Sequence, residues 1–223
     1  MSKVALYTYW RSSCSYRVRL ALAIKSIAYE SLCVDLLTGA QREAAYAEHN
    51  PMGYVPCLVL DGEPYVESVA IIELLEELHP SPSLLPEAPT DRAAVRALVQ
   101  IINAGTQPLQ NLNVLERFSG DKAARTEWAR HYMRRGLAAF EELAGRHAEA
   151  MGAPGPFVCG HAPSMADVFL VPQIYNARRF DLDLTPYPRI VRAEAAARET
   201  PWFAAARPEA QPDAPKDVLP SAT

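Results

Sequence analysis

An apolar run at residues 4–10 passes directly into a serine-rich segment with the character of a helix start. The run is β-branched and aromatic and holds no breaker, so it predicts a buried strand. Ser12, Ser13 and Ser15 can each cap a helix, and a helix-forming, apolar-periodic segment continues from there to Ile24. The first N–H groups of a helix lack partners and carry partial positive charge, so such a turn favours an anion, above all a thiolate. The alternative is that the serines only cap the helix.

The first 80 residues alternate between strand and helix signals. The dipeptide Asp61-Gly62 is a strong hairpin signal between two of the strands. An order of βαβ followed by ββα predicts a mixed four-stranded sheet with helices on its faces. The expected elements are a strand at 4–10, a helix at 13–26, strands at 29–36, 56–60 and 63–66, and a helix at 69–79.

Four prolines within residues 80–90 mark a linker, after which the strand signals stop. We therefore expect an α/β domain at 1–81, a linker at 82–90 and an all-helical domain at 91–223. Residues 164–167, Ser-Met-Ala-Asp, form a capping box in which Asp takes the usual place of Glu. The tail from Pro208 is expected to be irregular. The expected helices of the second domain are 91–115, 126–150, 165–176 and 189–198.

Composition narrows the function classes. A net charge of −4 gives no reason to expect a nucleic-acid partner. No apolar run approaches the roughly 20 residues of a membrane span, and residues 4–10 are too short for a signal-peptide core. The cysteines are widely spaced, which favours reduced thiols over disulfides or a metal site, and we expect a cytoplasmic protein without a metal. They are Cys14, Cys33, Cys57 and Cys159.

With its Ser/Cys turn and helical second half, the chain resembles a cytosolic glutathione transferase over about residues 4–212. The segments 12–19 (SSCSYRVR) and 107–112 (QPLQNL) are similar to the zeta class in particular. So are Arg179-Phe180 and 183–188 (DLTPYP). The resemblance implies a thioredoxin-like N-terminal domain, an all-α C-terminal domain, glutathione as cofactor and a homodimer.

The resemblance also implies roles for particular residues. Ser12 would face the glutathione sulfur, where a hydroxyl donor lowers a thiol pKa, and Ser13 and Cys14 complete the catalytic group. The carboxylates of a diacid substrate would be held by arginine, for which Arg11 and Arg179 are preferred and Arg178 is a further candidate. Gln107 and Asn111 would share one face of a helix that Pro108 kinks. The implied glutathione-binding residues are Gln41, Val55, Pro56 (with a cis bond between these two), Glu67 (usually Gln in the zeta class), Ser68, Gln107 and Asn111.

The zeta class includes maleylacetoacetate isomerase and maleylpyruvate isomerase. The implied activity is therefore glutathione-dependent cis–trans isomerisation of maleylacetoacetate to fumarylacetoacetate, a step in phenylalanine and tyrosine catabolism. Maleylpyruvate is the alternative substrate, and a general glutathione transferase is an alternative activity. Two further hypotheses stay open: a thiol transferase that uses Cys14 as nucleophile, and a non-catalytic binding module on the same fold.

Overall fold

The computed structural model describes residues 3–152 and 154–216. Of these, residues 3–83 together with 200–216 form one compact unit, and residues 84–152 together with 154–199 form the other. The segment from 200 thus groups with the first unit, whereas the sequence analysis assigned it to the helical domain. The physical reason is a contact between helix α9 (Pro201–Ala206) and helix α1 (Ser13–Ile24), where Arg19 Nε donates to the Ala206 carbonyl at 3.0 Å. The end of the expected tail, residues 217–223, lies outside the described residues.

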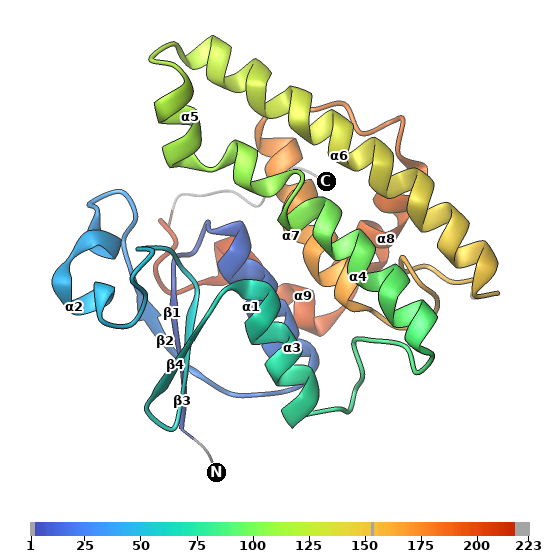
Figure 1. Cartoon of the computed structure of the whole chain (residues 1–223), viewed down its shortest axis with the longest axis horizontal. Coiled ribbons are helices and arrows are strands. Elements are labelled where there is room, and N and C mark those ends of the chain that lie inside the picture. Colours follow the sequence, from blue (N-terminus) through green and yellow to red (C-terminus); the bar gives the residue numbers. More distant parts are fainter. Residues whose placement is uncertain (1–2, 153, 217–223) are drawn as a thin grey trace. The chain divides into compact units, whose positions relative to one another are not determined.

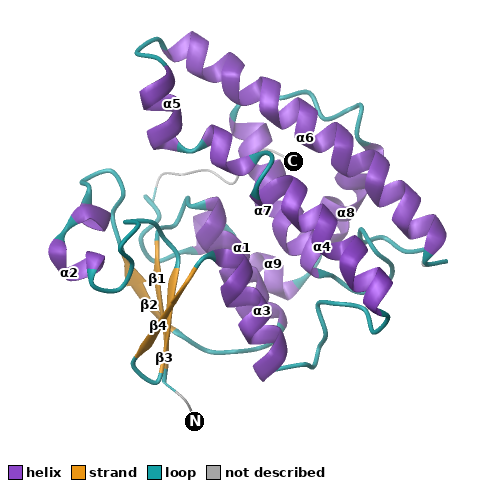
Figure 2. Cartoon of the chain, viewed as in Figure 1, coloured by secondary structure: helices purple, strands orange, loops and turns teal. Residues whose placement is uncertain are grey.

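The first unit is built on a four-stranded mixed sheet, as predicted (Figure 2). The strand order is β2-β1-β3-β4. Strand β1 pairs in parallel with β2 and antiparallel with β3, and β3 forms the expected hairpin with β4. Strand β1 ends before Tyr9 and Trp10, because the carbonyls of these two residues accept hydrogen bonds from the Arg19 guanidinium. The strands are β1 (Val4–Thr8), β2 (Glu30–Cys33), β3 (Cys57–Leu60) and β4 (Glu63–Val66).

Helices cover both faces of this sheet. Helix α1 and helix α3 (Ser68–Leu78) pack against each other on one side, and the short helix α2 (Ala44–Ala47) lies on the other (Figure 1). Because α3 and α9 both pack on α1, that helix is buried almost all round. Two 3₁₀ turns complete the unit: η1 (Ala40–Arg42) and η3 (Pro208–Ala210).

The regular elements of the second unit's described residues are helices, apart from an isolated β-bridge between Phe157 and Gly160. Helix α7 (Met165–Arg179) is its central element, buried over most of its length and packed against α4 and α8. The capping box at Ser164 and Asp167 is present as predicted, and Asp167 also accepts the Val158 N–H at 2.9 Å. The other helices are α4 (Pro89–Asn103), α5 (Leu112–Phe118), α6 (Lys122–Ala150) and α8 (Pro188–Arg198), with the 3₁₀ helix η2 (Gln107–Gln110).

The single helix expected at 91–115 is wrong. Helix α4 ends at Asn103, and the chain passes through η2 before α5 begins. Pro108 has no N–H to donate and lies in the first turn of η2, where that lack costs least. Among the described residues, no helix combines the length and the apolar character that a bilayer span requires.

Candidate active site

The sheet register brings three segments of the chain to one end of the first unit. Tyr7 pairs with Cys57, and Cys57 pairs with Val66, so these three residues form one row across the sheet. Strand β1 leaves this row toward Ser12, and β4 leaves it toward Glu67. Strand β3 enters it directly from Pro56. Three segments that the sequence analysis selected separately therefore converge at one end of the strands.

Ser12 occupies the N-cap position of α1. Its backbone is extended, with φ −66° and ψ 119°, and its Oγ accepts the Ser15 N–H at 3.2 Å. A capping serine uses an oxygen lone pair, so its own proton is still available to donate to another group. The capping role and the proposed role toward a sulfur are therefore compatible, and the structure supports the first of them directly.

Ser13 and Cys14 are the first two residues of α1 and differ in access. Ser13 is buried, whereas Cys14 is half-buried and its thiol is free. The other cysteines in the described part of the chain are also free thiols. The Cys14 side chain is therefore more accessible to a ligand at the helix start than the Ser13 side chain is.

The starts of α1 and α3 are joined by a buried arginine. Arg17 is 1% exposed, and its Nη1 donates to Ser68 Oγ at 3.1 Å. Burial lowers the pKa of the Arg17 guanidinium, while negative charge on Cys14 and on Glu67 acts in the opposite direction. A guanidinium stays charged under all ordinary conditions, so Arg17 places a positive charge beneath both helix starts.

Glu67 has an unusual backbone conformation. Its φ of 68° and ψ of 116° lie in a region that residues with a Cβ rarely adopt. Such conformations cost about 1–3 kcal/mol and cluster at ligand-binding positions. The Glu67 side chain is exposed and makes no capping hydrogen bond to α3, so its carboxylate does not serve as the helix cap.

The Val55-Pro56 peptide bond is cis, as the resemblance implied. The loop before it is held by two side chains that donate to the same carbonyl. Tyr46 Oη donates to the Tyr54 oxygen at 2.5 Å, and Asn50 Nδ2 donates to it at 2.7 Å. Burial raises the pKa of the Tyr46 hydroxyl, which stays a neutral donor at physiological pH. The backbone of Val55 is therefore fixed by groups that lie outside the predicted site.

Gln41 lies in η1 beside this loop. A Cβ on Gly53, which has φ +63°, would lie 3.0 Å from the Gln41 carbonyl oxygen, so the two segments are in close contact. Gln41 Oε1 is buried and has no hydrogen-bond partner among the described residues. Since amide oxygen and nitrogen assignments can be interchanged, this side chain has hydrogen-bonding capacity that a ligand could use.

The remaining predicted residues are distributed over both units. Arg11 is in the first unit, half-buried, with its guanidinium 5.5 Å from the centre of the Trp10 ring. Gln107 and Asn111 belong to the second unit. They do not share an α-helical face as predicted, because η2 and its C-cap replace the helix, but Gln107 Nε2 still donates to Asn111 Oδ1.

The two neighbouring arginines of α7 differ in their partners. Arg179 is exposed and donates to Asn176 Oδ1 at 3.0 Å. Arg178 Nη2 lies 2.6 Å from Glu194 Oε2, in an ion pair on which the contact between α7 and α8 partly depends. Arg178 is therefore the poorer candidate for a substrate carboxylate.

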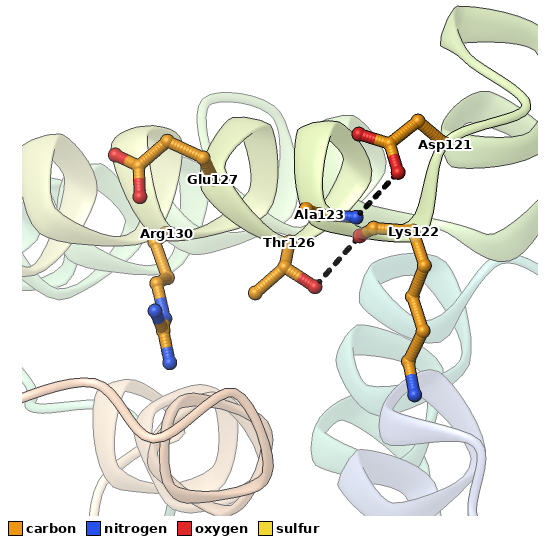
Figure 3. A pocket seen from close by; sticks show the side chains of 6 residues that line it. All are labelled: Asp121, Lys122, Ala123, Thr126, Glu127 and Arg130. Atoms are coloured by element: carbon orange, nitrogen blue, oxygen red, sulfur yellow. Dashed lines mark hydrogen bonds between the residues drawn. The ribbon is translucent and has the colours of Figure 1, made fainter.

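Two hollows among the described residues lie in the second unit, and none of the predicted residues lines them. The larger, about 460 Å³, surrounds the start of α6 (Figure 3). There the Asp121 carboxylate accepts the Ala123 N–H, and the Thr126 hydroxyl donates to the Lys122 carbonyl. The smaller, about 420 Å³, includes Asp91 and His147. Asp121 and Thr126 thus serve the helix itself, and the sheet register is the better guide to the site.

Sequence reasoning missed three charged residues around the α1 start: Arg17, Arg19 and Asp213. Arg19 is fully buried and donates to Thr8 Oγ1 and to three backbone carbonyls. The available signal was the placement of two arginines inside a helix whose other residues are apolar or small. No local signal marks Asp213, because its partner, the Trp10 N–H, is 203 residues away.

Comparison with known proteins agrees with the fold. The model of the family "Glutathione S-transferase, N-terminal domain" matches residues 11–78, which include the starts of both α1 and α3. The class that the first unit defines is therefore the glutathione transferases.

Full-length relatives narrow this class. Maleylacetoacetate isomerase of Dictyostelium discoideum is 44% identical over 218 residues, covering 96% of this chain and 97% of that protein. A crystal structure of maleylacetoacetate isomerase from Anaeromyxobacter dehalogenans 2CP-1, with glutathione bound in its active site, is 48% identical. It covers 96% of this chain and 99% of that one, with a TM-score of 0.86.

A holo structure of maleylpyruvate isomerase, described as a bacterial zeta-class glutathione transferase, is 39% identical. It covers 95% of this chain and all of that one, with a TM-score of 0.90. The chain belongs to the zeta-class glutathione transferases of the maleylacetoacetate isomerase family.

Proposed function

We propose that this protein is a glutathione-dependent isomerase that converts maleylacetoacetate to fumarylacetoacetate, as a step in phenylalanine and tyrosine catabolism. The observation that carries the proposal is the Arg17–Ser68 hydrogen bond, which couples the helix start that holds Ser12 to the one that follows Glu67. Identity of 43–46% to several proteins named maleylacetoacetate isomerase, over nearly the whole chain, supports the choice of reaction.

The residues of the first unit fit glutathione. The exposed Glu67 carboxylate suits the ammonium of the γ-glutamyl group, and Ser68 with the free N–H groups of α3 suits its carboxylate. The unused amide capacity of Gln41 suits the carboxylate at the other end of the tripeptide. We assign the backbone of Val55, before cis-Pro56, to the peptide part of the ligand.

Bound glutathione supplies a thiolate that adds to the cis double bond. That bond is single in the adduct and can rotate, and elimination of the thiolate then leaves the trans product. Ser12 donates its hydroxyl proton toward the sulfur and so favours the charged form. The N–H groups at the start of α1 and the buried Arg17 charge add positive potential at the same place. Ser13 and Cys14 line this helix start, and Cys14 acts there in positioning.

Arginine is suited to the two carboxylates of the substrate, and we assign these to Arg11 and Arg179. Arg178 is a poorer choice, because it is engaged in an ion pair with Glu194. Gln107 and Asn111, which hydrogen bond to each other, are proposed to support ligand binding from the second unit. We further propose a homodimer in the cytoplasm, in keeping with free thiols throughout the described residues.

Maleylpyruvate is the second candidate substrate, favoured by the TM-score of 0.90 to the maleylpyruvate isomerase structure. The experiment is an absorbance assay of the purified protein on both substrates, with and without glutathione. We expect isomerisation only with glutathione, and a higher kcat/KM for maleylacetoacetate. A higher kcat/KM for maleylpyruvate would reassign the substrate.

Isomerisation at full rate without glutathione would overturn the mechanism. Disulfide exchange that is lost in Cys14→Ala, with isomerisation absent from the start, would move the function to a thiol transferase. Absence of both activities together with failure to bind immobilised glutathione would leave a non-catalytic module.

A further inference from the structure

The segment after α9 is attached to the first unit by side-chain hydrogen bonds along its length. Gln211, which is 7% exposed, donates through Nε2 to the carbonyls of Ala205 and Arg207 at 3.0 and 2.9 Å. Arg19 holds the end of α9 through the Ala206 carbonyl. Residues 207–216 are therefore an ordered part of the unit that contains Ser12.

This segment ends in a direct contact with the turn between β1 and α1. Asp213 Oδ2 accepts the Trp10 N–H at 2.8 Å, and Trp10 lies two residues before the N-cap Ser12. The next residue, Ala214, packs against an apolar cluster that includes Trp10 and Val55. The tail thus contacts the turn before α1 and packs against the apolar cluster to which Val55 belongs.

The Trp10 residue is held through both of its backbone polar groups. Asp213 accepts its N–H, and Arg19 Nη2 donates to its carbonyl at 2.9 Å. Arg19 Nη1 also reaches the Tyr9 carbonyl, which in turn accepts the Ser12 N–H at 3.0 Å. Two charged side chains of opposite sign, from distant parts of the sequence, therefore fix the turn that carries the Ser12 hydroxyl. A charge-assisted hydrogen bond is about twice as strong as a neutral one, so the Asp213 contact is a substantial part of this restraint.

We propose that Asp213 is a positioning residue for the isomerisation, and that it acts by holding the Trp10–Ser12 turn so that the Ser12 hydroxyl faces the sulfur. This inference rests on the proposed function. Asp213 touches the backbone of the turn and takes no part in binding or proton transfer itself. A displacement of about 1 Å at a reacting group can cost on the order of 100-fold in rate, so loss of this restraint should affect kcat more than KM.

The test compares a variant that removes the Asp213 carboxylate with a variant that removes only the contact of this carboxylate with Cys33. Asp213→Ala removes the acceptor for Trp10. Cys33→Ala is the matched control, because the Cys33 thiol also donates to Asp213 Oδ2, at 3.4 Å, but lies outside the turn. We expect Asp213→Ala to lower kcat roughly 10- to 100-fold with a smaller change in KM for glutathione, and Cys33→Ala to leave both near wild type. Asp213→Asn keeps an oxygen acceptor and should recover most of the rate.

A pH titration of the bound glutathione thiol distinguishes positioning from a merely structural role. In Asp213→Ala the thiol pKa should rise toward that of free glutathione, whereas lower stability alone would leave it unchanged. If Asp213→Ala does not fold, a chain ending at Gln211 replaces it, compared with a chain ending at Lys216 as control. A wild-type kcat and a wild-type thiol pKa in Asp213→Ala, or in the chain ending at Gln211 that replaces it, would overturn the inference. A wild-type protein without glutathione-dependent activity would instead overturn the proposed function, and the inference with it.

Discussion

Glu67→Gly should make the protein more stable and at the same time a poorer glutathione binder. The φ of 68° and ψ of 116° at Glu67 cost about 1–3 kcal/mol for a residue with a Cβ. Glycine removes that cost but gives the unfolded chain about 0.4–1 kcal/mol of additional conformational freedom. The net expectation is a gain of about 1 kcal/mol in the free energy of unfolding, which for a chain of this size raises Tm by about 2–4 °C.

The same substitution removes the carboxylate that we assign to the ammonium of glutathione. A hydrogen bond to a charged group contributes about 1.5–3 kcal/mol, so glutathione affinity should fall about 10- to 100-fold. Thermal unfolding measures the first effect, and isothermal titration calorimetry measures the second. Glu67→Gln keeps the strained backbone and should leave Tm near wild type. It should weaken binding less than Glu67→Gly does, because glutamine usually stands at this position in the zeta class.

Ser26→Gly is the matched control. Ser26 also has a positive φ, 55°, but it is an exposed residue just beyond the C-cap of α1, at the other end of that helix from Ser12. Glycine is favoured just after a helix, so this variant should raise Tm without changing glutathione affinity. The reasoning is refuted if Glu67→Gly lowers Tm, or if it leaves the affinity for glutathione unchanged.

Three further outcomes follow from contacts in the two units. Arg17→Met removes the donor to Ser68 and should weaken glutathione binding about 10- to 100-fold by calorimetry, whereas unchanged affinity would exclude a role in the site. Gly136→Ala would place a Cβ 1.9 Å from Thr106 Oγ1, so it should destabilise the protein by about 1–3 kcal/mol in urea unfolding, and adding Thr106→Ala should restore most of the loss. Burial raises the pKa of Asp167 to about 6, against about 3.9 for an unfolded chain, so between these values only the folded state holds the proton. The stability of wild type relative to Asp167→Asn should therefore decrease as pH rises from about 4 to 6, and an increase over that range would contradict the raised value.

Local sequence signals were sufficient for the first unit. Alternation of apolar residues and the Asp61-Gly62 hairpin predicted the mixed sheet, and the row Tyr7–Cys57–Val66 is the direct consequence of that topology. The start of α1 at Ser13 was predicted correctly, because it depends only on neighbours within one helical turn, whereas the sequence left open which serine forms the N-cap.

The errors arose where distant contacts override local signals. The exception is the expected helix at 91–115, where a local signal was underweighted: helix α4 ends at Asn103, and the chain turns through η2, whose first turn holds Pro108. The described tail beyond η3 is irregular, as expected, but nothing in its composition indicates that Asp213 reaches the Trp10 N–H. Arg17 likewise gives no local sign that it meets Ser68, since the pairing depends on how α1 and α3 pack.

The most direct test of the account is to measure the pKa of the glutathione thiol when glutathione is bound to wild type and when it is bound to Ser12→Ala. The ultraviolet absorbance of the thiolate reports the titration. Free thiols of this kind titrate near pH 8.5. The account predicts a pKa at least one unit lower on the wild-type protein, and a return toward the free value in Ser12→Ala with loss of glutathione-dependent isomerisation. An equally low thiol pKa in Ser12→Ala would contradict the assignment of Ser12 as the residue that stabilises the thiolate.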